Sequence, residues 1–113
     1  PLCNICADRN RRPETICVVE TIREVIAIES TQQYNGLYHV LGGIISPLDG
    51  VGPDQLEIDS LIRRVHELKT QELIFALSPN IQGDTTIYYI SKKITGLPVK
   101  MVKMNITDVF RLN

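Results

Sequence analysis

The chain has 113 residues, enough for one hydrophobic core but not for two. Of these residues, 43% are apolar and 22% are charged, a composition typical of a folded domain. Its formal net charge of −1 predicts no strong nonspecific affinity for nucleic acid. No apolar run approaches the length of a membrane span, and the start lacks the apolar core of a signal peptide, so we expect a cytoplasmic protein. Because the sequence begins at Pro1 and leads at once into a cysteine pair, we also expect a piece of a longer protein.

Two of the three cysteines lie in the first segment. Cys3 and Cys6 have the C-x-x-C spacing of half a structural zinc site, which normally takes four ligands as two such pairs. The sequence has no second pair, so half of a zinc site and two ordinary thiols remain alternatives. Cys17 lies inside an apolar run and is expected to be a buried thiol.

The first half of the chain predicts a strand, a helix and a second strand. Residues 16–19 are a continuous apolar run, typical of a strand that is buried on both faces. Thr21 and Glu24 match a capping box, in which a hydroxyl and a carboxylate satisfy the first free amides of a helix. The turn residues at 34–36 predict the end of that helix, and 37–41 predict the second strand.

Residues 42–53 predict a loop, because four glycines and two prolines in this stretch exclude regular structure. The glycine spacing makes neither a dinucleotide fingerprint nor a P-loop, so no nucleotide is expected, and a nucleotide-binding module is the weakest hypothesis. A recognition or lid loop explains this stretch better. Its candidate functional contacts are Gly42, Gly43, Asp49, Gly50 and Gly52.

The second half of the chain continues the alternation. Apolar residues at helical spacing predict a helix over 58–68, with Arg64 on its outward face. A strand over 72–77, a helix over 85–94 and a strand over 98–104 follow. The order of these elements predicts an α/β fold in which a mostly parallel four-stranded sheet carries helices on both faces.

Ligands of parallel sheets gather at the carboxyl ends of the strands. Here those ends bring together Glu20, the 42–53 loop and the turn at 78–84. Glu20 stands where a metal-binding or acid/base group would be placed, but a polar residue that contacts nearby helix amides is equally consistent with the pattern. His39 is expected to be a structural histidine, because no nucleophile is arranged with it at a recognisable spacing.

Several stretches resemble known families. Val18-Val19-Glu20, with the turn at 78–84, resembles the Toprim domain of type IA topoisomerases and primases, in which a first-strand Glu joins an Asp-x-Asp motif. The C-x-x-C pair together with 16–20, 36–43 and 46–53 resembles the RecR family of bacterial recombination mediators, roughly over residues 1–95 and in the expected order.

The resemblance implies a Toprim-like, Rossmann-like domain over 16–113, preceded by the remnant of a zinc finger at 1–15. Ser78 and Asn80 stand where an enzymatic Toprim domain holds its Asp-x-Asp carboxylates, and neither side chain carries the anionic charge that holds Mg²⁺. The resemblance therefore implies a noncatalytic protein. The alternative is a Mg²⁺-dependent Toprim nuclease or topoisomerase-like enzyme that uses Glu20, Asp49 and Asp84.

The RecR resemblance also implies partners. The full-length protein would bind zinc, form a homo-oligomeric ring, and work with RecO or RecF to load recombinase onto single-stranded DNA. The family's DNA-binding helix-hairpin-helix is absent from this chain, so we expect weak DNA binding or none. The tail at 100–113 lacks the Gly-rich segment of the family, so family contacts are not transferred to it. The residues assigned to docking of a basic partner are Glu20, Glu24 and Asp84.

Overall fold

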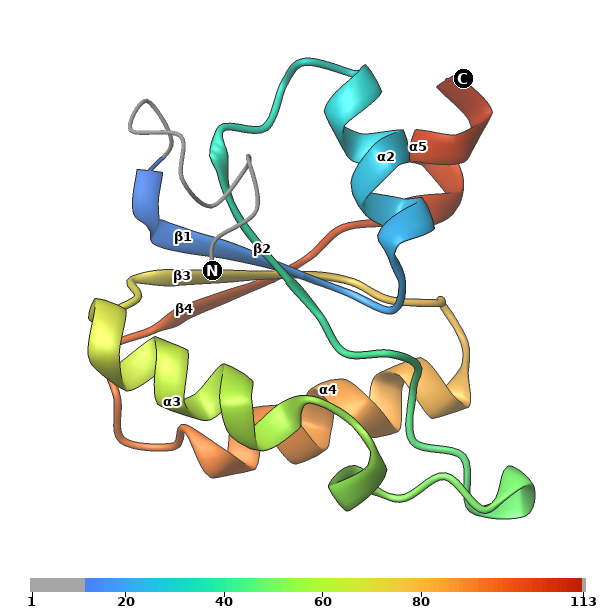
Figure 1. The fold of residues 1–113 in the computed structure, drawn as a ribbon, viewed down its shortest axis with the longest axis vertical. Coiled ribbons are helices and arrows are strands. Elements are labelled where there is room, and N and C mark those ends of the chain that lie inside the picture. Colours follow the sequence, from blue (N-terminus) through green and yellow to red (C-terminus); the bar gives the residue numbers. More distant parts are fainter. Residues whose placement is uncertain (1–11, 113) are drawn as a thin grey trace.

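The computed structural model describes residues 12–112, which form a parallel sheet between two layers of helices (Figure 1). The sheet has the order β2-β1-β3-β4, and every neighbouring pair of strands is parallel. Its strands are β1 (Arg12–Val19), β2 (Gly36–Val40), β3 (Glu72–Ala76) and β4 (Lys100–Lys103). The helices are α2 (Ile22–Ser30), α3 (Ile58–Leu68), α4 (Ile81–Lys93) and α5 (Ile106–Leu112), with short 3₁₀ turns η1 (Pro47–Asp49) and η2 (Pro53–Gln55).

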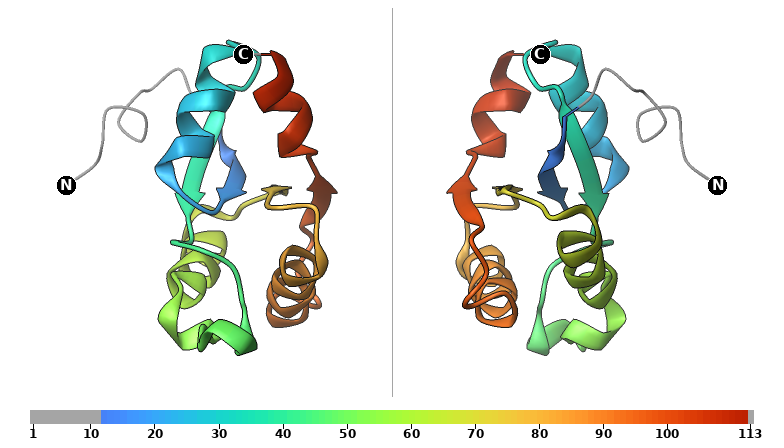
Figure 2. Two further views of the ribbon diagram at one scale, coloured as in Figure 1. Left: turned by 90° about the vertical axis from the view of Figure 1, so that its right-hand side faces the viewer. Right: turned by 90° about the vertical axis from the view of Figure 1, so that its left-hand side faces the viewer.

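The helices lie on both faces of the sheet, with α2 and α5 on one face and α3 and α4 on the other (Figures 1 and 2). Strand β1 lies inside the sheet and alternates between the two cores, because successive side chains of a strand point to opposite faces. Ile16 and Val18 pack with residues of α3 and α4, whereas Cys17 and Val19 pack with residues of α2 and α5. The predicted fold class is therefore confirmed.

Side-chain caps mark the starts of α2 and α4. The capping box predicted at α2 is present, since the Thr21 amide donates to the Glu24 carboxylate at 2.7 Å. Helix α4 begins at Ile81, four residues earlier than the predicted start, because the Asn80 side chain accepts a hydrogen bond from the Gly83 amide at 2.8 Å. This cap was not predicted from the sequence.

The end of α2 and the character of the 42–53 loop also differ from the predictions. Helix α2 ends at Ser30 rather than at 34–36, because Gln32 has a left-handed backbone, with φ of 56°, that cannot continue a right-handed helix. The hydroxyls of Ser30 and Thr31 donate to the carbonyl oxygens of Ala27 and Ile28, each at 2.7 Å, at this end of the helix. The 42–53 loop contains 3₁₀ turns, so its prolines and glycines shape short turns instead of excluding all regular structure.

Helix α5 was also not predicted, although its Ile106 is buried in the core beside α2.

No helix in the described part of the chain is both long enough and apolar enough to cross a membrane.

Candidate functional site

The carboxyl ends of three strands meet at one edge of the sheet. Val19, the last residue of β1, pairs with Val40 of β2 and with Ala76 of β3. Beyond the strand, the Gly42 amide donates to the Glu20 carbonyl oxygen at 2.8 Å, so the 42–53 loop starts beside Glu20. The predicted convergence of Glu20, the loop and the 78–84 turn at this edge is confirmed.

Glu20 links the end of β1 to the turn after β3. Its half-buried carboxylate accepts a hydrogen bond from the Ser78 amide at 2.7 Å, across 58 residues of sequence. A bond of this kind to an ionised acceptor is shorter and stronger than one between neutral groups. Glu20 thus holds the turn at 78–84 in place, rather than contacting the amides of the helix that follows it.

The turn itself is built by Asn80 and Gly83. The Asn80 side chain caps α4, and the Asn80 backbone carbonyl oxygen accepts from the Asp84 amide at 3.0 Å. A Cβ atom added at Gly83 would collide with the Ser78 carbonyl oxygen, so glycine is required by close approach of the backbone. In this chain Asn80 therefore serves to start a helix.

Asp84 is the most accessible of the predicted partner contacts. Its side chain is 61% exposed and lies 3.0 Å from the Nζ of Lys103, whose side chain is 64% exposed. An ion pair this exposed contributes about 0–1 kcal/mol to stability, because water screens it. The carboxylate can therefore exchange Lys103 for another cation at little cost.

Glu24 lies in a different environment. It is buried, and its carboxylate accepts from both the amide and the hydroxyl of Thr21, at 2.7 and 3.0 Å. These bonds satisfy the start of α2. Its role as a partner contact stays a prediction, and one that would require the cap to open.

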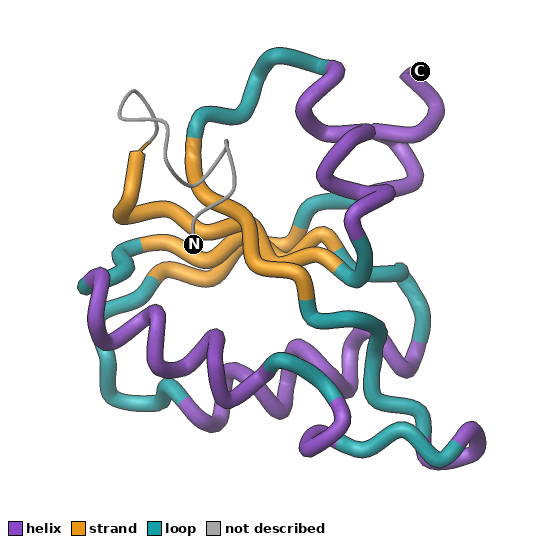
Figure 3. The backbone as a smooth tube through the Cα atoms, in the orientation of Figure 1, coloured by secondary structure: helices purple, strands orange, loops and turns teal. Residues whose placement is uncertain are grey.

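The 42–53 loop is ordered by its own hydrogen bonds and by one bond to α4. Gly42 and Gly50 have φ of 92° and 75°, in the left-handed region that favours glycine. The Asp49 carboxylate accepts from the Ser46 hydroxyl at 2.8 Å. The buried Ile45 amide donates to the Thr86 hydroxyl of α4 at 2.9 Å. Figure 3 shows the loop running past the first turns of α4.

The carboxylates near this edge do not fit a metal centre. Among residues 12–112, no group of three or more His, Cys, Asp or Glu side chains could hold a metal ion. Glu20, Asp49 and Asp84 are each engaged with a different protein donor. The prediction of zinc ligands at Cys3 and Cys6 lies outside the described residues.

His39 and Arg64 form a partly buried contact that was not predicted from the sequence. The Nε2 of His39 lies 2.6 Å from the Glu57 carbonyl oxygen, and the Nη1 of Arg64 lies 3.0 Å from its Nδ1. Because arginine only donates, Nδ1 must accept, so His39 is neutral and Nε2–H donates to Glu57. Burial lowers the pKa of His39, and the nearby Arg64 charge acts in the same direction. The contact ties β2 to α3, and it corrects the prediction that Arg64 points outward.

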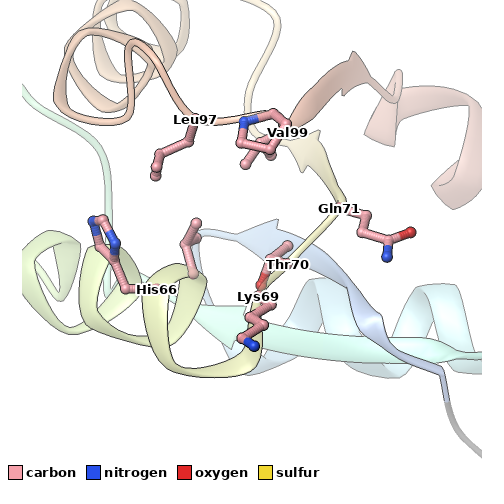
Figure 4. Close-up of a pocket in the computed structure, with 8 residues that line it drawn as sticks. His66, Lys69, Thr70, Gln71, Leu97 and Val99 are labelled. Atoms are coloured by element: carbon pink, nitrogen blue, oxygen red, sulfur yellow. The ribbon is translucent and has the colours of Figure 1, made fainter.

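A cavity of about 350 Å³ lies at the opposite edge of the sheet, where β3 and β4 begin (Figure 4). Val65, Leu97 and Val99 give it largely apolar walls. Thr70 also lines it, and the buried Thr70 hydroxyl has no hydrogen-bond partner among the described residues. The cavity holds none of the residues predicted to be functional.

Comparison with known proteins places this geometry in a family. Proteins named Recombination protein RecR are 58% identical over 100 residues in Amoebophilus asiaticus, 57% over 99 in Phocaeicola vulgatus and 52% over 107 in Porphyromonas gingivalis. These matches cover 88%, 88% and 93% of this chain but 50%, 48% and 52% of the relatives, so the chain spans about half their length. The resemblance to RecR is thereby confirmed. The model of the Toprim domain matches residues 14–104, and the chain therefore belongs to the Toprim domain family.

Proposed function

We propose that this chain is the noncatalytic Toprim domain of a RecR-like recombination mediator that acts in recombinational DNA repair. The domain docks RecO or RecF, and the complete homo-oligomer helps to load recombinase onto single-stranded DNA. The three relatives compared above, each named Recombination protein RecR, support the repair role.

The observation that carries the proposal is the use of the strand edge as a scaffold. Ser78 and Asn80 occupy the positions that the Toprim resemblance assigns to catalytic carboxylates. Here the Ser78 amide binds Glu20 and the Asn80 side chain caps α4. Two-metal phosphoryl chemistry needs several carboxylates around one point, and this edge does not supply them. A rigid edge with acidic groups suits recognition of a basic protein better.

Glu20 and Asp84 are the residues proposed to meet that partner. Asp84 belongs to the 78–84 turn and faces solvent, and Glu20, at the end of β1, orders the backbone of that turn through the Ser78 amide. Exposed charge at an interface mainly speeds encounter, whereas a charge pair that becomes buried governs dissociation. Asp84 is thus expected to act mostly on the association rate, and Glu20 on the lifetime of the complex.

The test is a calorimetric titration of the chain with RecO from the same organism. Glu20→Lys with Asp84→Lys should weaken binding at least tenfold, or about 1.4 kcal/mol. Each reversal is also made singly, and Glu67→Lys on the exposed face of α3 is the matched control for each single reversal, because it makes the same charge change away from the edge. Glu20→Gln removes the charge but keeps an oxygen that can accept from the Ser78 amide. It therefore distinguishes an effect of the lost charge from an effect of a disordered 78–84 turn. RecO binding that is unchanged by the double reversal would remove these residues from the interface.

The alternative enzyme hypothesis has its own test. A Mg²⁺-dependent Toprim nuclease or topoisomerase would cleave or relax plasmid DNA, and the activity would disappear in Glu20→Gln. Such activity in the parent chain would overturn the noncatalytic assignment.

Zinc enters the proposal only for the complete protein. Cys3 and Cys6 would supply two of the four ligands of a tetrahedral site, and the other two would come from sequence beyond this chain. Metal analysis of the complete protein, with and without Cys3→Ser and Cys6→Ser, tests this assignment.

A further inference from the structure

A groove of about 630 Å³ lies between the 42–53 loop and the start of α4. One wall is formed by residues 45–48 of the loop and the other by Asn80 and residues of the first turn of α4. No charged side chain lines it. Because the turn at 78–84 contributes to this wall, the groove adjoins the edge proposed for docking.

The groove exposes apolar side chains from both walls. Leu48 is 96% exposed and Ile81 is 82% exposed, the two highest values among the large apolar residues of the described chain. Single exposed apolar residues are common on protein surfaces, but two that flank one apolar groove form a contiguous patch. Binding hot spots concentrate in patches of this kind, where an anchor side chain can be fully desolvated.

The loop that presents Leu48 is held rigidly. Ser46 and Val51 exchange two backbone hydrogen bonds of 2.9 Å, and the Gly50 amide donates to the Pro47 carbonyl at 3.1 Å. The Ile45 amide anchors the base of the loop to Thr86. A preorganised loop loses little conformational entropy on binding, so an exposed leucine at its tip is well placed to contribute affinity.

The charged residues that adjoin the groove along its two lining segments are acidic. The lining residues belong to 45–48 and 80–85, and these segments contain no lysine or arginine. Asp49 follows Leu48 in the chain and Asp84 precedes Thr85, and both aspartates are exposed. Lys103 of β4 pairs with Asp84 through an exposed contact. Exposed like charges beside an apolar groove attract the opposite charge and repel acidic competitors.

From the apolar groove, its rigid exposed leucine and its acidic surroundings, we propose that the groove binds a partner segment with one apolar anchor side chain flanked by lysine or arginine. The inference rests on the proposed docking function and deepens it by naming the chemistry of the docked segment. Leu48 and Ile81 would supply the apolar contact, and the surrounding carboxylates would select basic flanks.

A random dodecapeptide phage library, selected on the whole folded chain, tests the proposal without reference to any natural partner. Enriched peptides should carry Leu, Ile, Phe or Trp beside Lys or Arg. In calorimetric titrations with the strongest peptide, Leu48→Ala and Ile81→Ala should each reduce the affinity roughly tenfold. Added salt should also reduce the affinity of the parent chain for this peptide. The exposure of both residues means that these changes leave the core intact, which thermal unfolding verifies.

The matched control is Ile26→Ala. Ile26 is 65% exposed on α2, in the layer on the other face of the sheet, so its truncation should leave peptide affinity unchanged. The proposal is overturned if no peptide is enriched, if enriched peptides lack basic residues, or if Ile26→Ala weakens binding as much as Ile81→Ala does.

The same variants separate this inference from the docking function. If RecO binding is lost on charge reversal at Glu20 and Asp84 but is unchanged in Leu48→Ala and Ile81→Ala, the docking function stands and the groove proposal fails. If peptides bind the groove as described while RecO does not bind the parent chain, the groove proposal stands and the RecO assignment fails.

Discussion

The hydrogen bond between Ile45 and Thr86 should control how firmly the 42–53 loop is held to α4. Thr86 is fully buried, and its hydroxyl accepts from the Ile45 amide at 2.9 Å while it donates to the Gln82 carbonyl at 2.8 Å. Thr86→Val keeps the shape of the side chain and replaces the hydroxyl by a methyl group, which neither accepts nor donates a hydrogen bond. The Ile45 amide would then be buried without a partner.

The cost follows from that unpaired amide. A buried donor that loses its acceptor destabilises a protein by about 1–3 kcal/mol. A chain of this length loses roughly 4 °C of melting temperature per kcal/mol. Thermal unfolding followed by circular dichroism should therefore show a fall of about 4–12 °C in Thr86→Val. Hydrogen exchange should show faster exchange of the Ile45 amide, whereas Thr86→Ser should keep it protected.

Thr70→Val makes the same chemical change with the opposite expected sign. The Thr70 hydroxyl is buried and has no hydrogen-bond partner within the described chain, so its removal deletes an unsatisfied group. We expect the melting temperature to stay level or to rise by a few degrees, on the order of 1 kcal/mol of stability. A similar fall in both variants would refute the reasoning, because the loss would then come from threonine itself and not from its bonding.

Three further perturbations address the site and its support. Glu20→Ala should lower the unfolding free energy by about 1–2 kcal/mol in urea titrations, because the Ser78 amide loses a charged acceptor, whereas Glu20→Gln should lower it less. Since burial lowers the pKa of His39, the unfolded chain binds a proton that the native chain does not, and stability should decline as pH falls below about 6.5. This decline should become shallower in His39→Gln, and an unchanged pH profile would contradict the assignment. Burial raises the pKa of Cys17 to about 12, so in a variant whose other cysteines are serine, maleimide should label the chain only after unfolding.

The amino-acid sequence by itself determined the fold class and the location of the candidate site. The apolar run at 16–19 predicts burial on both faces, and β1 does lie between two neighbours with these residues fully buried. The capping box of Thr21 and Glu24 is equally readable, because both partners lie within one helical turn. Convergence of Glu20 with the 42–53 loop and the 78–84 turn also follows, since parallel strands end at a common edge.

Only the tertiary structure decided which side chains at this edge are engaged and which are free. The bonds from Ser78 to Glu20 and from Ile45 to Thr86 span 58 and 41 residues, and no local pattern encodes such pairs. The contact between His39 and Arg64 depends on the position of α3 against β2. Helical periodicity carries no information about that position, so it predicted wrongly that Arg64 lies on the outward face of the helix. Local signals arise from bonds within a few residues, whereas these contacts arise from the crossovers and the packing that bring distant segments together.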